Sequence, residues 1–180
     1  CLVLSILALG MDGLCQEPWR KAFGAYGPDE ASSVRMTAEG DIVTAGSTGS
    51  FGSGSSDAYL LKVSGSGDLL WSRAIGGPQV DHAQALLILN DGSLVFAGFS
   101  NDGGAGGYDG WLVKMDSEGM ILWQRYYGGM DWDLLYDLDV TLDGGFLLSG
   151  ATFSTGAGAS DGWLLRTDQD LSLIHISEPT

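Results

Sequence analysis

Cysteine is almost absent from this chain of 180 residues, which has only Cys1 and Cys15. Because both lie in the first 15 positions, the rest of the chain cannot form an internal disulfide and offers no thiol nucleophile. Histidine is equally scarce, and His82 is the one histidine before the last ten residues. A single imidazole without a supporting motif does not make a catalytic set, so we expect no enzymatic activity.

Basic residues are also few. The chain has 8 Lys and Arg against 23 Asp and Glu, which gives a formal net charge of -15. Such a surface repels phosphate backbones, so binding to nucleic acid is disfavoured. The acidic residues are spread along the chain, as expected for a soluble protein or for one that gathers cations.

Long apolar runs are missing as well. The run Cys1–Leu9 is too short to span a bilayer, and we expect no membrane span. Gly13 and Cys15 are small residues that fit the selective positions of a signal-peptidase site. We therefore expect residues 1–15 to be a signal peptide that is truncated at its start, and the mature chain to be extracellular or at the cell surface.

Glycine, in contrast, is abundant, and its 29 residues recur at fixed places in a repeat of 52 residues. The repeat needs no gaps and defines units 19–70, 71–122 and 123–170 within a domain of residues 16–170. Nine positions that recur with this spacing are interpreted as structural: Trp19, Trp71, Trp123, Asp57, Asp109, Asp161, Gly46, Gly98 and Gly150.

Each unit reads as four short strands and shows no helical periodicity. In the middle unit the strands are expected at about 83–89, 93–99, 110–115 and 120–125, with a type I′ turn at Asn90-Asp91-Gly92. Several strands are apolar on both faces, which predicts sheets packed between other sheets. The predicted fold class is therefore all-β, a partial β-propeller forming an open arc of about three four-stranded antiparallel blades.

The two ends of the repeated region also carry information. Trp19–Phe23 matches the fourth strand of a unit, and the third unit is expected to lack that strand. Gly67 and Gly119 precede this strand in the first two units, whereas the third unit has Leu171 there. Residues 171–180 resemble the translated end of a transposase adaptor used in sequencing libraries, so we interpret them as a non-native tail.

These motifs resemble the SBBP-type β-propeller repeats of secreted bacterial proteins. The resemblance covers about residues 19–170. Its motifs include Asp143-Gly144-Gly145-Phe146-Leu147 and Asp109-Gly110-Trp111-Leu112-Val113-Lys114. The first unit departs from the pattern at Ala25, which replaces the second glycine of a pair. The resemblance implies a surface location and further modules in the full-length chain, and it implies no reaction.

Two features could carry a binding site. Asp131, Asp133, Asp137 and Asp139 form the densest acidic group and are candidate calcium ligands, although Asp133 also occupies a repeated position. Trp132 departs from the repeat and is the candidate for binding a ligand by stacking.

We expect a module for binding or structural display, with no cofactor unless calcium binds, and with a protein or glycan as the partner. The alternatives are a fragment of a secreted carbohydrate-active enzyme and a calcium-stabilised adhesin segment.

Overall fold

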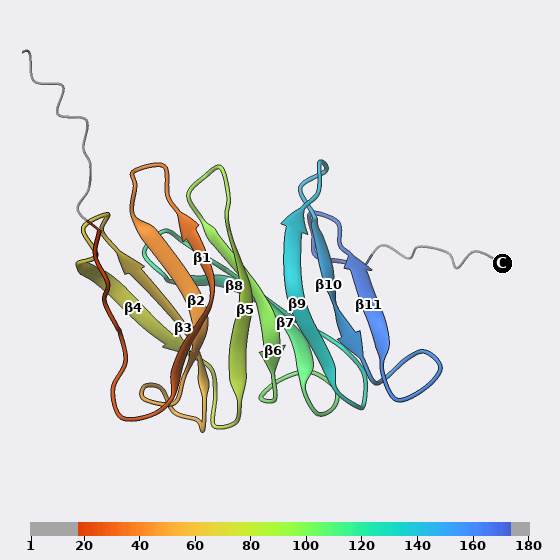
Figure 1. The fold of residues 1–180 in the computed structure, drawn as a ribbon. Helices are drawn as coiled ribbons and strands as arrows, with labels where there is room; N and C mark the ends of the chain where they lie inside the picture. Colours follow the sequence, from red (N-terminus) through yellow and green to blue (C-terminus); the bar gives the residue numbers. More distant parts are fainter. Residues whose placement is uncertain (1–17, 174–180) are drawn as a thin grey trace, which may run out of the picture.

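The computed structural model describes residues 18–173, all of whose regular elements are β-strands (Figure 1). The predicted signal peptide and most of the predicted tail lie outside the described residues. Eleven strands form three antiparallel sheets in which sequence neighbours pair. The first sheet contains β1 (Asp29–Met36), β2 (Ile42–Thr48), β3 (Asp57–Val63) and β4 (Leu69–Ile75).

The second and third sheets repeat this order. The second contains β5 (Asp81–Ile88), β6 (Leu94–Ser100), β7 (Asp109–Met115) and β8 (Ile121–Tyr127). The third has only β9 (Asp133–Val140), β10 (Phe146–Thr152) and β11 (Asp161–Arg166). The predicted fold class is therefore confirmed: the protein is an open arc of blade-like sheets, two with four strands and one with three. The described residues contain no helix that could cross a membrane.

The first hairpin turn of the second sheet differs from the predicted type I′. In the second sheet Gly92 N donates to Leu89 O at 2.9 Å, and Leu89 N donates to Ser93 O at 2.8 Å. Gly92 has a φ of +80°, whereas Asp91 is not among the residues with positive φ. A type I′ turn requires positive φ at both central residues, so the prediction was wrong. The loop is one residue longer than expected, and only the glycine is left-handed.

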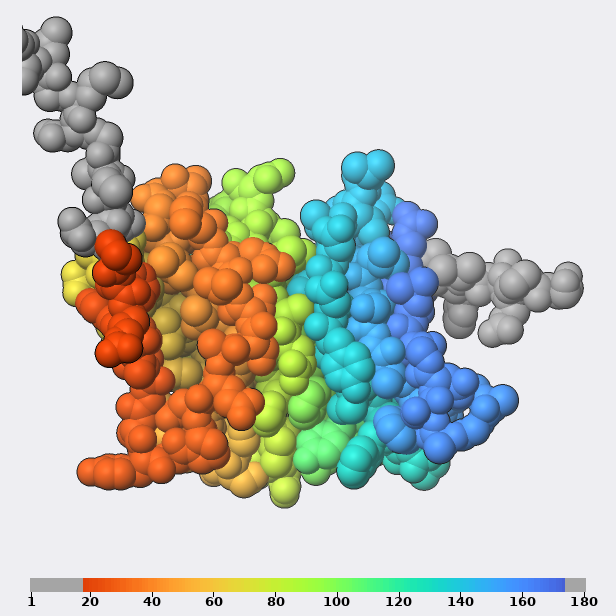
Figure 2. Space-filling view, in the orientation of Figure 1, coloured from red at the N-terminus to blue at the C-terminus, as the bar shows by residue number. Residues whose placement is uncertain are grey.

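The sheets follow one another in sequence order across the molecule, from orange to blue (Figure 2). They pack face to face through two apolar layers. The layer between the first and second sheets contains Leu60 and Phe96, and the layer between the second and third contains Leu112 and Leu148. All four side chains are fully buried. In β6 the four residues Leu94, Val95, Phe96 and Ala97 alternate between these layers, which explains why this strand is apolar on both faces.

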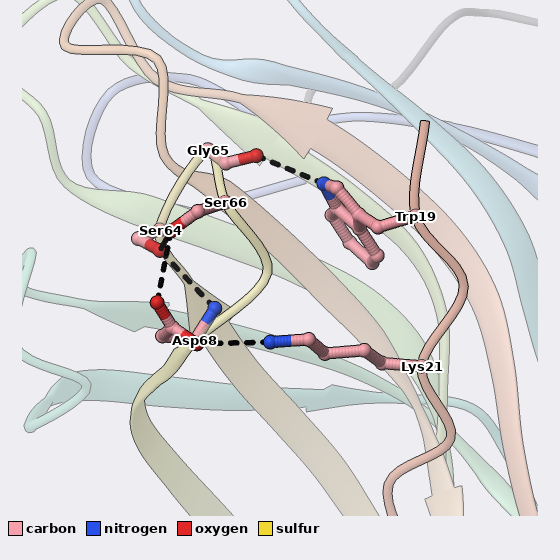
Figure 3. A network of polar contacts seen from close by, with 6 residues as sticks. All are labelled: Trp19, Lys21, Ser64, Gly65, Ser66 and Asp68. Carbon is pink, nitrogen blue, oxygen red and sulfur yellow. Dashed lines mark hydrogen bonds and ion pairs between the residues drawn. The ribbon is translucent and has the colours of Figure 1, made fainter. Parts of the chain in front are cut away.

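The segment before β1 lies against the outer face of the first sheet (Figure 3). Trp19 Nε1 donates to Gly65 O at 3.0 Å, and Lys21 pairs with Asp68 at 2.9 Å. Phe23 packs against the apolar residues of β3. Trp19–Phe23 is not a strand, because no strand of a preceding sheet lies beside it in the described chain.

Residues 19–23 nevertheless contact the first sheet in the way that β4 contacts the second sheet. An added Cβ at Gly67 would lie 2.9 Å from the Trp19 ring, and one at Gly119 would lie 3.3 Å from the Trp71 ring. The tryptophans are 52 residues apart, as are the glycines. Residues 19–23 therefore occupy the place of the fourth strand of a preceding sheet.

Candidate functional site

The repeated glycines Gly46, Gly98 and Gly150 stand opposite a β-bulge in the first strand of each sheet. An added Cβ at Gly98 would lie 1.8 Å from the carbonyl oxygen of His82, and the other two glycines meet the corresponding oxygen at 1.9 and 1.8 Å. Only glycine fits so close to the opposite backbone. These positions shape the sheets and leave no side chain for a site.

The repeated aspartates at the start of the third strands hold the glycine-rich loops. Asp57 and Asp109 are buried and accept hydrogen bonds from Gly54 N at 3.2 Å and from Gly106 N at 3.3 Å. Asp161 lies partly buried at the same place in the third sheet. These carboxylates satisfy backbone donors in the loops, which is a structural role.

The repeated tryptophans lie at junctions between sheets. Trp71 is buried in the layer between the first and second sheets. Trp123 packs against the next layer, with its ring centroid 6.1 Å from that of Phe146. Trp19 is 39% exposed on the outer face of the first sheet.

The four aspartates considered for calcium do not come together. Asp133 is buried and accepts hydrogen bonds from Gly129 N at 2.7 Å and Ser154 Oγ at 2.6 Å. Asp137 and Asp139 are exposed, as is Asp131. In residues 18–173 no three Asp, Glu, His or Cys side chains are grouped so that they could hold a metal ion. In the described structure this acidic group is therefore dispersed, and calcium binding by the chain stays a prediction.

Trp132, in contrast, is part of a continuous row of rings. Its ring centroid lies 5.3 Å from that of Tyr108 and 6.2 Å from that of Phe153. Tyr108 lies 5.4 Å from Phe99, which stacks on His82 at 4.9 Å. We call these five side chains the aromatic row.

The aromatic row lies where the first strands begin and the second strands end, at the lower end of the sheets in Figure 1. It runs from the second sheet to the third. Trp132 and Phe153 are 53% and 40% exposed, so their rings are open to solvent. Rings held by one another present a rigid apolar surface, which loses little conformational entropy on binding.

None of the five positions is aromatic in the other repeats. The first repeat has Glu30, Ser47, Ser56, Pro28 and Gly49 there, as the 52-residue spacing shows. A packing requirement shared by all the sheets would place rings in every repeat. The aromatic row is therefore specific to the junction between the second and third sheets.

A second departure from the repeat brings two carboxyl groups together. In the first and third repeats a serine hydroxyl donates to the aspartate that begins the first strand: Ser50 to Asp29 at 2.7 Å and Ser154 to Asp133 at 2.6 Å. The middle repeat has Asp102 at the serine position, facing Asp81. Burial of Asp81, with a further contribution from the adjacent Asp102 carboxyl, raises the pKa of Asp81 to about 6.

Because of the raised pKa of Asp81, we expect the free energy of unfolding to fall as the pH rises. The pKa of Asp81 is higher in the folded protein than its ordinary value of 3.8. The contribution of Asp81 to the free energy of unfolding is therefore complete below about pH 4 and is lost as the pH rises through about 6. A shift of about two units corresponds to about 3 kcal/mol. Because solvent reaches Asp102 and screens the pair, we expect about 1–2 kcal/mol.

Asp102→Ser restores the serine of the other repeats and should reduce this loss, because a hydroxyl replaces the neighbouring carboxyl group. Burial of Asp81, the larger cause, remains, so we expect the variant to be more stable than the parent at pH 7.5 by up to about 1 kcal/mol. Urea unfolding at pH 4.5 and 7.5 measures the difference. Burial lowers the pKa of His82, but this contribution is present in both proteins and cancels in the comparison. Equal pH dependence in the two proteins would contradict the assignment to Asp81 and Asp102.

Comparison with known proteins supports the fold. The structure is similar to the crystal structure of a protein of unknown function from Bacteroides caccae, with a TM-score of 0.52 and 13% sequence identity. The match covers 81% of this chain and 44% of that protein, so this chain spans less than half of its length. No protein-family model and no curated protein matches the sequence.

Sequence reasoning found Trp132 but missed the other members of the aromatic row. Phe99 and Tyr108 lie in or beside the second sheet and Phe153 beside the third, so strand pairing and the stacking of the two sheets are needed to bring them together. Asp102 was missed as well. The aromatic row and Asp102 share one signal in the sequence: at these positions one repeat differs in chemistry from the others.

Proposed function

We propose that this chain is a secreted, non-catalytic binding module with β-propeller repeats, and that it holds a glycan against the aromatic row. The observation that carries the proposal is the exposed pair Trp132 and Phe153, with Tyr108 packed edge-on against Trp132. Aromatic faces pack on the C–H groups of pyranose rings, and rigid rings make this contact at low entropic cost.

Export is part of the proposal. The leader-like start of the sequence and the absence of cysteine from residues 16–180 both favour a cysteine-independent fold outside the cell. The net charge of -15 favours a neutral ligand over a polyanionic one, because an acidic surface repels phosphate and sulfate groups.

Trp132→Ala should weaken glycan binding by at least about tenfold, because it removes the largest exposed face of the row. Binding is first detected on an array of neutral oligosaccharides and then measured by calorimetry with the best array ligand. Phe153→Ala should have a smaller effect in the same direction. Circular dichroism should show an unchanged fold, since Trp132 is 53% exposed.

Tyr26→Ala is the matched control, because Tyr26 is fully exposed and lies outside the row. This variant should bind the ligand as the parent does. Absence of any array ligand, or full affinity in Trp132→Ala, would contradict the proposal. If the partner is instead a protein, that protein should bind Trp132→Ala with the same affinity as the parent.

A further inference from the structure

A cavity of about 250 Å³ lies between the end of β4 and the strands β7 and β8. It is separate from the aromatic row, which shares none of its lining residues. The residues that matter for its chemistry are Asp81, Asp102, Trp111, Ile121, Gln124 and Tyr126.

One of the lining side chains is a buried carboxylate with an oxygen that lacks a partner, as is also the case for the buried Asp109 and Asp133. Asp81 is fully buried, and its Oδ1 has no hydrogen-bond partner among the described residues. Its Oδ2 accepts a hydrogen bond from Gly77 N at 2.9 Å. Leaving a buried carboxylate oxygen unpaired costs free energy, which a donor bound in the cavity would recover.

The second carboxyl group lies beside it, toward the solvent. Asp102 is exposed, and its Oδ2 accepts a hydrogen bond from Gln79 N at 2.9 Å. The salt bridges of the described chain involve neither Asp81 nor Asp102. At neutral pH the two carboxyl groups therefore concentrate negative charge that no basic side chain balances.

The walls are aromatic and apolar. The rings of Trp111 and Tyr126 are stacked, with 4° between their planes and 6.1 Å between their centroids. Trp111 Nε1 donates to Gln124 Oε1 at 3.2 Å, so that amide oxygen is already used. Calcium requires six to eight oxygen ligands, and this lining does not supply them. Carboxylates beside aromatic rings suit an organic cation, which has both N–H donors and hydrocarbon.

Three of the residues that give the cavity this chemistry differ from their equivalents in the first repeat. The first repeat has Ser50, Ser72 and Ala74 at the positions of Asp102, Gln124 and Tyr126. Three departures from the repeat thus meet in one cavity. A structural requirement of the sheet would not explain them, because the first sheet forms without them.

We propose that this cavity binds a small primary ammonium ion, whose N–H groups are held by Asp81 and Asp102 and whose hydrocarbon part contacts Trp111 and Tyr126. The buried Asp81 carboxylate supplies the unpaired acceptor, and Asp102 supplies the second charge at the mouth. The site is independent of the glycan proposal and would stand if that proposal failed.

The experiment is thermal unfolding of the chain at pH 7.5 with n-butylammonium chloride as the ligand. At 20 mM we expect the melting temperature to rise by about 3 °C or more over a sodium chloride sample of equal ionic strength. The rise should saturate, and the total tryptophan fluorescence should change over the same concentration range, because Trp111 lines the cavity.

Asp102→Ser and Tyr126→Ala should reduce the butylammonium shift to that of sodium chloride. Both restore residues found at these positions in the first repeat, so the variants should fold. Asp131→Ser removes an equal charge outside the cavity and should keep the full shift. The proposal is overturned if butylammonium gives no shift, if Asp102→Ser retains it, or if calcium chloride gives the shift and butylammonium does not.

Discussion

Leu112→Ala should lower the free energy of unfolding by about 3 kcal/mol, whereas Leu164→Ala should lower it by less than about 1 kcal/mol. The two leucines occupy the same position in consecutive repeats. Leu112 is fully buried between the second and third sheets, and Leu164 is 59% exposed on the outer face of the third. The difference between the variants therefore measures what packing one sheet on the next contributes.

Leu60→Ala provides the second comparison. Leu60 is the equivalent residue in the first sheet and is fully buried against the second. Leu60→Ala should lower the free energy of unfolding by about as much as Leu112→Ala, because the two junctions are built in the same way. Urea unfolding followed by tryptophan fluorescence gives all three values. Equal losses at Leu112 and Leu164 would contradict the stacking of the sheets.

Gly98→Ala should destabilise the protein by about 3 kcal/mol or more. The added Cβ would lie 1.8 Å from the carbonyl oxygen of His82, so β5 and β6 would have to separate at the bulge. The contact is with backbone rather than with the end of a flexible side chain. The strain therefore cannot be relieved by a change of rotamer.

Gly162→Ala is the matched control for Gly98→Ala. Gly162 also lies in a strand, but an added Cβ there would meet nothing within 4 Å. It should change the free energy of unfolding by less than about 0.5 kcal/mol. A loss at Gly98 no larger than the loss at Gly162 would show that the bulge is not formed as described.

Much of the fold could be predicted from the sequence, because each residue can be compared with the residues at the same position in the other repeats. The expected strands of the middle repeat agree with β5 to β8 within two residues at each end. The three-stranded third sheet was also expected, from the register of Trp19 and Trp123. Apolar residues on both faces of β6 predicted the stacked sheets.

The turns were harder to predict, because Asp91-Gly92 fits two kinds of hairpin loop. The choice between them depends on the strand register, which local sequence does not determine. The sequence break at Leu171 has a structural counterpart. Leu171 has a φ of +67° and is the one described non-glycine residue with positive φ, at a position where Gly67 and Gly119 have +81° and +79°.

The candidate sites could be predicted only in part. Trp132 was found because it departs from the repeat, whereas its partners Tyr108 and Phe153 belong to loops whose proximity depends on the stacking of two sheets. Asp102 illustrates the same limit. Its importance follows from the partner it faces, and Asp81 lies 21 residues before it in the sequence.

Equivalent sheets, each formed from one period of the repeat, pack face to face, and this packing underlies the whole fold. Methyl NOE spectroscopy on the isotope-labelled chain tests it most directly. We predict cross-peaks between sheets in the cluster that holds Leu60 and Leu86, and in the cluster that holds Leu112 and Leu148. Methyl cross-peaks confined to residues of the same sheet would contradict the account.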